Sequence, residues 1–266
     1  MRFWLLVLFA LALTTPERVE AGEPQRGGTS AGEAQSQPTN STPDFLFGRP
    51  RGSIGIHGSW FLGRASSDFY DFVTDQLTLN KGDFNRPSVG TEGAVTLGRR
   101  FDVVFGVDYG QSTTNSEYRR LVDNNRLPIE QTTVIRDTQI MAGVKYALTD
   151  RGRPVGQLAW VPKSLVPFVG AGAGAMYFQL TQSGDFVDYV DYSVFPDVFE
   201  AKGWAPTAHV FGGVDYRLLR RLYLNVEGRY IWASGDLGRT FIGFERLDLA
   251  GFRMAAGINL VFEEAR

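Results

Sequence analysis

His57 and Ser59 come nearest, of all residues in this sequence, to the types and spacing of a catalytic site. Side chains two residues apart on a β-strand point to the same face, so the imidazole could activate the serine hydroxyl as a nucleophile. The local alternation places both residues on a glycine-rich face, opposite Ile56 and Trp60. No asparagine follows Ser59, and no third residue that would orient the histidine is evident. We therefore expect no enzymatic activity, and catalysis by His57 and Ser59 is kept as an alternative.

The sequence contains few residues that could bind a metal ion or a cofactor. The two histidines, His57 and His209, lie far apart in the sequence, and cysteine is absent. Transition-metal sites need several nitrogen or sulfur ligands, and the acidic segments lack the spacing of a calcium-binding loop. The net charge of −2 does not provide the basic surface that a nucleic-acid partner requires. We expect no cofactor, no metal and no nucleic-acid partner.

The N-terminal region predicts export. Arg2 precedes an apolar run from Trp4 to Leu13, and Val19-Glu20-Ala21 resembles a small-residue cleavage site. This is the pattern of a secretory signal peptide over residues 1–21, and the apolar run is too short to span a membrane as an anchor. Residues 22–47 are rich in Gly, Ser, Thr, Gln and Pro, which favours a flexible periplasmic linker. Without cysteine, neither a disulfide nor a lipoprotein attachment site is expected.

The rest of the chain alternates between apolar and polar residues with a period of two. In residues 222–230, Leu222, Leu224 and Val226 share one face, while Asn225 and Glu227 share the other. Such alternation indicates a β-strand with one apolar and one polar face. The same pattern recurs in eight segments, at about 52–64, 86–98, 101–110, 129–148, 166–182, 204–217, 222–230 and 246–262. Most have about the ten residues that a tilted strand needs to cross a bilayer.

The connections between these segments also follow a pattern. Those after the second and sixth segments are short, whereas residues 66–85, 114–128, 183–203 and 235–245 form longer ones. Short periplasmic turns and long outer loops are typical of outer-membrane barrels. The connection at 149–165 is a long exception. We predict an all-β fold over residues 48–266, an eight-stranded antiparallel up-and-down transmembrane β-barrel, with a soluble β-protein as the alternative.

In such a barrel the polar faces point into a narrow lumen. Its residues must be small or able to pair, because little room is available and buried charges need partners. Glycines 170, 172 and 174 all fall on this face of the fifth segment. We expect a lumen filled by an ion-pair network of Glu92, Asp108, Lys145, Asp215, Glu227, Arg229 and Arg253.

Two of the long connections combine acidic and aromatic residues. We expect extracellular loop contacts from Phe69, Tyr70, Phe72, Asp185, Phe186, Asp188, Tyr189, Asp191 and Tyr192. Loops of this kind could bind divalent cations that bridge to lipopolysaccharide, or contact a partner protein at the cell surface. They could also cap the barrel and shape a small hydrophobic pocket, or form an ordinary solvated rim.

The chain resembles the small outer-membrane β-barrel proteins of the OmpA/OmpX/OmpW-like group over about residues 48–262. The motifs that carry this resemblance are Pro167-Phe-Val-Gly-Ala-Gly-Ala-Gly174, Gly213-Val-Asp-Tyr-Arg217, Leu224-Asn-Val-Glu-Gly-Arg-Tyr230 and Ala256-Gly-Ile-Asn-Leu-Val-Phe262. The resemblance implies the bacterial outer membrane, contact with its lipid and lipopolysaccharide, and folding by the barrel-assembly machinery. In this group a terminal aromatic, here Phe262, serves as the assembly signal, although Glu263-Glu-Ala-Arg266 follow it.

One barrel of this kind serves many tasks, so the function depends on the site and not on the fold. We expect a structural or surface-interaction role without catalysis. A narrow channel for small hydrophobic solutes, as in OmpW-like members, is the first alternative. A lipid-modifying barrel enzyme that uses His57 and Ser59 is the second, because outer-membrane barrel lipases space histidine and serine in a similar way.

Overall fold

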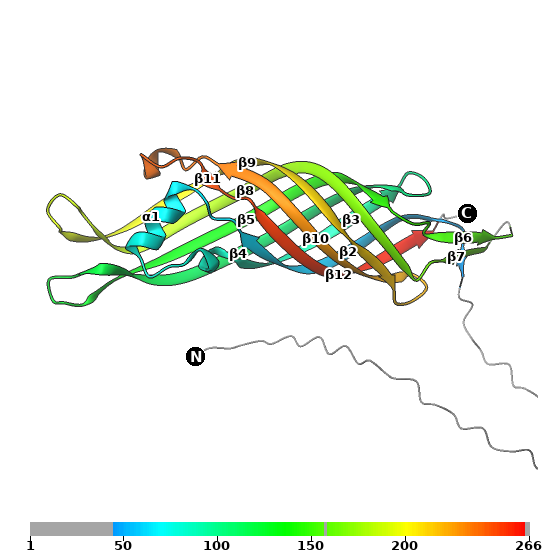
Figure 1. Ribbon diagram of the computed structural model, residues 1–266, viewed down its shortest axis with the longest axis horizontal. Helices are drawn as coiled ribbons and strands as arrows, with labels where there is room; N and C mark the ends of the chain where they lie inside the picture. The colour runs from blue at the N-terminus through cyan, green and yellow to red at the C-terminus, as the bar shows by residue number, and fades with distance from the viewer. Residues whose placement is uncertain (1–44, 157–158, 264–266) are drawn as a thin grey trace, which may run out of the picture. The chain divides into compact units, whose positions relative to one another are not determined.

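A computed structural model describes residues 45–156 and 159–263, and eight long strands dominate this part of the chain (Figure 1). The predicted signal peptide (1–21) and residues 22–44 of the predicted linker lie outside the described residues. The eight strands are β2 (Pro50–Gly63), β3 (Arg86–Thr96), β4 (Phe101–Val122), β5 (Pro128–Ala147), β8 (Leu165–Val187), β9 (Val194–Arg217), β10 (Leu222–Gly235) and β12 (Gly251–Glu263).

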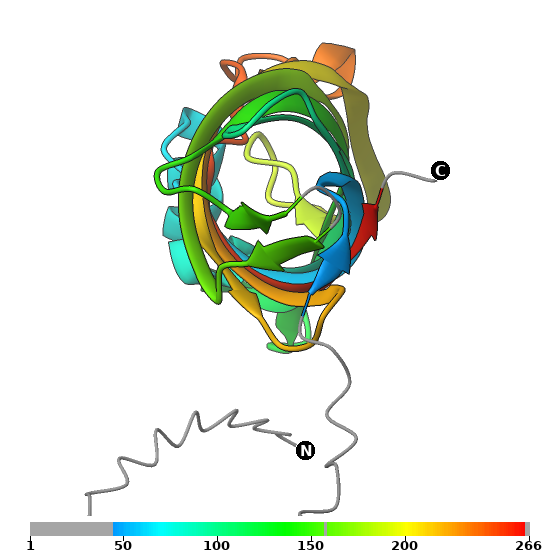
Figure 2. The same ribbon diagram turned by 90° about the vertical axis from the view of Figure 1, so that its right-hand side faces the viewer.

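These strands close into a ring. Each pairs antiparallel with the next along the chain, and β12 pairs with β2, for example at Ile258 and Ile56. Closure leaves no strand of the ring without a neighbour on either side, as a sheet surrounded by lipid requires. Figure 2 shows the ring from its short-turn end. The predicted eight-stranded antiparallel up-and-down barrel is confirmed.

The outer face of the ring is apolar and exposed. Ile56 and Leu97 each keep 68% of their surface accessible, which a water-soluble protein could not repeat around its whole girth. Other members of this apolar belt are Ile54, Trp60, Val89, Phe105, Val107, Ile140, Val144, Val210, Val226, Met254 and Ile258. The belt therefore faces lipid, as the sequence predicts. Among the described residues, no helix is long and apolar enough to cross a membrane.

Two predicted loops are largely strand. Residues 114–128 and 183–203 are predicted to be long connecting loops, but β4 and β5 stay paired up to Val122 and Pro128, and β8 and β9 up to Val187 and Val194. Continuing the ladder satisfies backbone groups that an irregular loop would leave to water. The eighth strand begins at residue 251, later than predicted, because β11 (Leu247–Asp248) pairs with β10 instead.

The first long connection folds over the barrel end. It contains α1 (Asp68–Gln76) and the short helix η1 (Lys81–Phe84), while η2 (Gly238–Phe241) lies in the last long connection. Asp68 and Asp71 occupy the first turn of α1, where carboxylates interact favourably with the helix dipole. The buried residues of these segments and of the strands beneath them form an apolar plug: Phe61, Ala65, Phe69, Tyr70, Val73, Leu77, Leu79, Phe84, Ile135, Met176, Phe178, Leu180, Ala201, Ala205, Ile231, Leu237, Phe241, Leu247 and Leu249.

A small second sheet lies at the opposite, short-turn end. The long exception at 149–165 forms β6 (Gly152–Val155) and β7 (Ala159–Pro162), and β7 also pairs with β1 (Leu46–Phe47). This mouth sheet, β1-β7-β6, lies at the opening of the ring in Figure 2. Leu46 is fully buried in it, so the last two residues of the predicted linker belong to this sheet.

Candidate functional site

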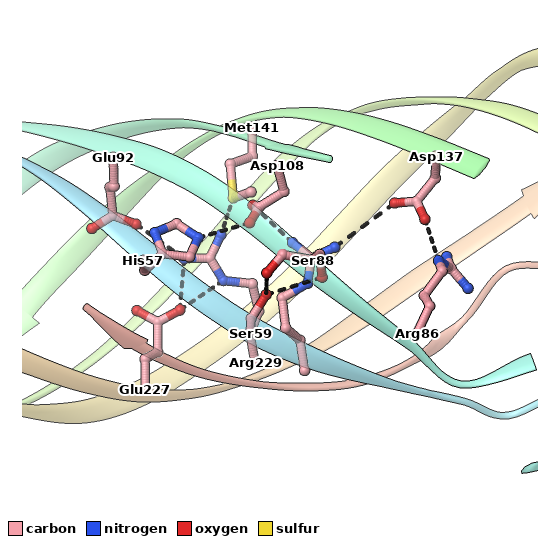
Figure 3. Close-up of polar contacts among 11 residues, drawn as sticks. His57, Ser59, Arg86, Ser88, Glu92, Asp108, Asp137, Met141, Glu227 and Arg229 are labelled. Atoms are coloured by element: carbon pink, nitrogen blue, oxygen red, sulfur yellow. Dashed lines mark hydrogen bonds and ion pairs between the residues drawn. The ribbon is translucent and has the colours of Figure 1, made fainter. Parts of the chain in front are cut away.

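The part of the lumen nearer the short-turn end contains two groups of ion pairs, one around Lys145 and one around Arg229. The Lys145 Nζ atom lies 2.8 Å from Asp215 Oδ2, and the Lys145 ammonium also lies 3.7 Å from the centre of the Phe168 ring. Arg229 donates to Glu227 at 2.7 Å and to Glu92 at 3.1 Å. One guanidinium therefore holds two carboxylates, which come from β3 and from its own strand (Figure 3).

A third group of ion pairs centres on Asp108. One of its oxygens lies 2.7 Å from Arg253 Nη1, and the other lies 2.7 Å from His57 Nε2. Farther along the lumen, Asp137 contacts Arg86 and lies 3.9 Å from Arg253. The structure thus places all seven predicted lumen residues inside the barrel, each within 3.1 Å of an opposite charge.

Sequence reasoning missed further members of this network. Arg86 and Asp137 both follow the inward parity of their strands, so the alternation alone could have placed them. Arg151 could not be found this way, because it lies just before β6 and reaches back to Asp102 at 2.6 Å. That pair connects the mouth sheet to the barrel wall.

Glycines on the lumen face make room for these side chains. A Cβ atom on Gly90 would collide with Asp108 and His57, and one on Gly172 would collide with His209. In the narrow ring, the large side chains of one strand therefore lie against the glycine backbone of a neighbouring strand, where no side chain competes for space. This explains why the glycines of the fifth predicted segment all fall on one face.

His57 and Ser59 have separate partners. His57 pairs with Asp108, while the Ser59 hydroxyl lies 3.0 Å from the Ser88 hydroxyl (Figure 3). Both side chains lie on the lumen side and not on the lipid side of β2. Among the residues that the structure describes, no group of three or more histidine, aspartate or glutamate side chains is arranged to hold a metal ion.

The lumen narrows from the short-turn end upward. A chamber of about 70 Å³ lies at that end, between the Lys145–Asp215 pair and the Arg151–Asp102 pair. Beside Arg229 and Glu227 the free space falls to about 10 Å³, which is at most enough to hold one water molecule. Beyond Arg253 and the Arg86–Asp137 pair the apolar plug begins, so the described interior changes from charged to apolar along its length.

The predicted loop residues divide into two sets. Phe69 and Tyr70 are buried in the plug, and Phe186 packs against Phe199 at 4.5 Å between ring centres. These three therefore do not form the surface that was expected of them. The helix α1 turns the rings of Phe69 and Tyr70 inward, and Phe186 lies on β8, where it packs against β9. Burial raises the pKa of the Tyr70 hydroxyl well above its ordinary value.

The other predicted residues remain accessible. Phe72 is partly exposed on the outer side of α1, and Asp185 is half-buried, with its carbonyl accepting a bond from Gln131. Asp188, Tyr189, Asp191 and Tyr192 form the turn between β8 and β9 and are exposed. This turn, residues 188–193, is the extracellular tip.

No family model matches the chain, and no curated protein matches it. Among solved structures, it is similar to Neisserial surface protein A (14% identity, 79% of this chain and 97% of that one, TM-score 0.43). It is also similar to Ail, the attachment invasion locus protein of Yersinia pestis (11% identity, 80% and 100%, TM-score 0.41), and to outer membrane protein AlkL in lipid bilayers (15% identity, 92% and 98%, TM-score 0.36).

These likenesses are too low to carry an argument of their own. The closed ring, the apolar belt and the division into short-turn and long-loop ends come from the chain itself. Together they make it a small β-barrel protein of the bacterial outer membrane. The short-turn end, where the described residues begin and end, is the periplasmic end, and the long-loop end is extracellular.

Proposed function

We propose that this barrel is a non-enzymatic protein that acts through its extracellular surface. The observation that carries the proposal is the length of β8 and β9, 23 and 24 residues, about twice what is needed to cross a bilayer. Their hairpin projects beyond the belt and ends in exposed apolar residues, with Val190 92% and Tyr192 64% accessible. Exposed apolar groups at a projecting tip favour contact with a partner.

The extracellular tip is held in shape by its own hydrogen bonds. Asp188 Oδ1 accepts from the Val190 amide at 2.8 Å, and Asp191 Oδ1 accepts from the Ser193 amide at 2.9 Å. The bonds from Ser193 hold the pKa of Asp191 below its ordinary value, so it is ionised at neutral pH. The Tyr189 hydroxyl bonds to Gln76 on α1. A pre-shaped tip loses less entropy on binding, and its charge favours a basic partner with apolar side chains.

The binding test uses the full chain in lipid nanodiscs and immobilised lysozyme as a basic protein probe. A Val190→Ser and Tyr192→Ser double variant should weaken binding by about tenfold, because two exposed apolar anchors are lost. The matched control is Val122→Ser and Leu127→Ser, which changes the tip of the neighbouring hairpin. Equal binding by the tip variant and the control variant would contradict the assignment of the partner surface to residues 188–193.

The proposal includes a lumen closed to ions. It is supported by the Arg229 cluster, which leaves space for about one water molecule, and by the plug beyond it. In planar bilayers the protein should give no steady ionic current. Regular single-channel openings by the unmodified protein would overturn this part of the proposal without affecting the role of the extracellular tip.

A second candidate is the passage of small hydrophobic solutes. It is favoured by a groove of about 570 Å³ on the outer wall, where Pro206, Ala208 and Trp232 lie beside a polar rim that includes Arg64, Glu245 and Asp248. A solute that moves from this groove into the plug would bypass the charged lumen. Uptake of an alkane by vesicles that contain the protein, reduced by Ala208→Trp, would favour this candidate over surface interaction.

Catalysis by His57 and Ser59 is the remaining alternative. Asp108 could orient the imidazole as the aspartate of a catalytic triad does, but the Ser59 hydroxyl lies beside Ser88, and both side chains face the lumen and not the lipid. Ser59→Ala should therefore leave the phospholipid and lysophospholipid content of vesicles unchanged, as measured by mass spectrometry. Lipid cleavage by the unmodified protein that disappears in this variant would establish an enzyme.

A further inference from the structure

The two ends of the barrel carry opposite charge. At the periplasmic end, residues 49–51, 97–100, 148–164 and 217–221 contain ten basic residues, against the acidic residues Asp150 and Glu263 at the same end. At the extracellular end, residues 64–85, 111–136, 179–203 and 235–250 contain fifteen acidic and nine basic residues. Although the total charge is only −2, positive charge is concentrated at the periplasmic end of the barrel and negative charge at the extracellular end. We call the basic residues of the periplasmic segments the basic collar.

Several cations of the collar already have protein partners. Arg100 pairs with Asp150 at 3.1 Å, Arg221 pairs with Glu263 at 2.8 Å, and Arg151 is taken up by Asp102 inside the lumen. By contrast, Arg99, Arg153, Lys163 and Arg220 have no ion-pair partner among residues 45–156 and 159–263. Their charge is available to an external anion.

The collar lies directly at the lower rim of the apolar belt. Arg99 is flanked by the exposed residues Leu97 and Phe101, and Arg220 follows the exposed residue Leu219. Long cationic side chains next to lipid-facing residues extend to the level of the lipid headgroups while their stems stay against the acyl chains. The anions within reach at that level are the phosphates of phospholipids.

We propose that the basic collar binds anionic phospholipid headgroups in the periplasmic leaflet of the outer membrane. A guanidinium group matches phosphate through two parallel hydrogen bonds, and several of them around one rim attract anionic lipid over neutral lipid. The acidic extracellular end offers no comparable surface. Because the collar lies at the end opposite the extracellular tip, this inference does not depend on the proposed surface interaction.

The test measures which lipids surround the full chain. The protein is folded into phosphatidylcholine vesicles that contain about 30% phosphatidylglycerol, and the lipids retained after extraction are counted by native mass spectrometry. The collar variant is Arg99→Gln with Arg220→Gln. The matched control is Arg126→Gln with Arg239→Gln, which removes two exposed arginines from the extracellular end, one in a turn and one in η2.

Unmodified protein and control should retain phosphatidylglycerol about threefold above its share of the vesicle, and the collar variant should fall to about that share. Retained enrichment in the collar variant, or an equal loss in the control, would overturn the proposal. The shift in electrophoretic mobility between unheated and heated samples shows whether each variant has folded. If the collar variant does not fold, Arg99→Gln and Arg220→Gln are tested singly, and each should lower the enrichment.

Salt gives a measurement that needs no variant. Attraction between exposed charges is screened by salt, so enrichment by the unmodified protein should disappear at about 0.5 M NaCl. Enrichment that is indifferent to salt would contradict a headgroup interaction. Collar-dependent sedimentation with purified peptidoglycan, in the absence of any preference for phosphatidylglycerol, would assign the surface to the cell-wall polymer and refute the lipid proposal.

Discussion

The two halves of the barrel interior are filled by different means. In the extracellular half, side chains from α1, η1 and η2 return into the ring and meet inward residues such as Phe178 and Ile231 in an apolar plug. In the periplasmic half, charged side chains from the wall pair over glycines. The same ring accepts either filling. Where connections fold back into the ring at the extracellular end, apolar groups fill the space. At the periplasmic end the wall supplies most of the filling, and Arg151 of the connection 149–165 adds one charged group.

The largest expected effect lies in the charged half. Arg229→Ala leaves Glu92 and Glu227 without their shared partner, and breaking a buried ion pair from one side costs about 3–5 kcal/mol. Urea unfolding followed by electrophoretic mobility should report this loss. Arg120→Ala, which breaks an exposed pair with Asp75, is the control and should cost about 0–1 kcal/mol. Similar losses for the two variants would mean that the interior pairs are no stronger than surface ones.

The plug should respond differently. Phe69 is almost fully buried and stacks edge-on against Phe241 and Phe244, so Phe69→Ala should weaken docking of α1 by about 3–5 kcal/mol. The ring does not depend on α1, so we expect faster proteolysis within residues 66–85 and an unchanged mobility shift on heating. Phe72→Ala removes a half-exposed ring that touches only the edge of the plug at Phe244, so proteolysis should rise much less. Loss of the whole barrel in the Phe69 variant would show that the halves fold as one unit.

The mouth sheet gives a prediction of intermediate size. Arg151→Gln removes the partner of the buried carboxylate of Asp102, at a cost of about 2–3 kcal/mol. In this variant we expect backbone hydrogen exchange in β6 and β7 to be faster than in the unmodified protein, whereas exchange in the ring stays the same. Mass spectrometry measures both rates. Arg153→Gln, two residues away and exposed, is the matched control. Exchange that is equal in the two variants would exclude a stabilising role for the Arg151–Asp102 pair.

The smallest effect concerns the glycines of the charged half. A methyl group on Gly172 would press on His209 and on the backbone of β5, so Gly172→Ala should cost about 1–2 kcal/mol. On the outer face, Gly58→Ala meets no atom within 4 Å and should be neutral or slightly stabilising. Urea midpoints of the two variants provide the comparison. Equal midpoints would mean that the lumen relaxes around an added methyl group.

The sequence predicts the ring well because one physical pattern governs it. Alternation marks which residues face lipid, and β3, β4 and β10 begin where the pattern begins, at Arg86, Phe101 and Leu222. The same parity places Glu92 and Arg229 inside. It cannot say that they meet, because β3 and β10 are not neighbours, and their relative height depends on the stagger of the closed ring.

The two barrel ends are harder to predict. In residues 68–76 the alternation of acids and aromatics is compatible with a solvated loop and with a helix that buries Phe69, Tyr70 and Val73. Which one forms depends on the apolar surface that the ring presents beneath it. Arg151 likewise reaches Asp102 from a connection whose path no period determines. The alternation of residues within one strand can be recognised in the sequence. Contacts between a connection and the barrel wall can be predicted only when the geometry of the closed ring is known.

The mouth sheet also has a mechanical consequence. The Leu46–Trp160 pairing and the hydrogen bond from the Phe47 amide to Glu263 join the beginning of the described chain to β7 and to the end of β12. A pulling force applied ahead of Phe45 is therefore carried first by these contacts and by the stacking of Arg49 on Trp160. The contacts of the mouth sheet should therefore break before β2 separates from β3 and β12, and breaking them leaves the ring of the barrel intact.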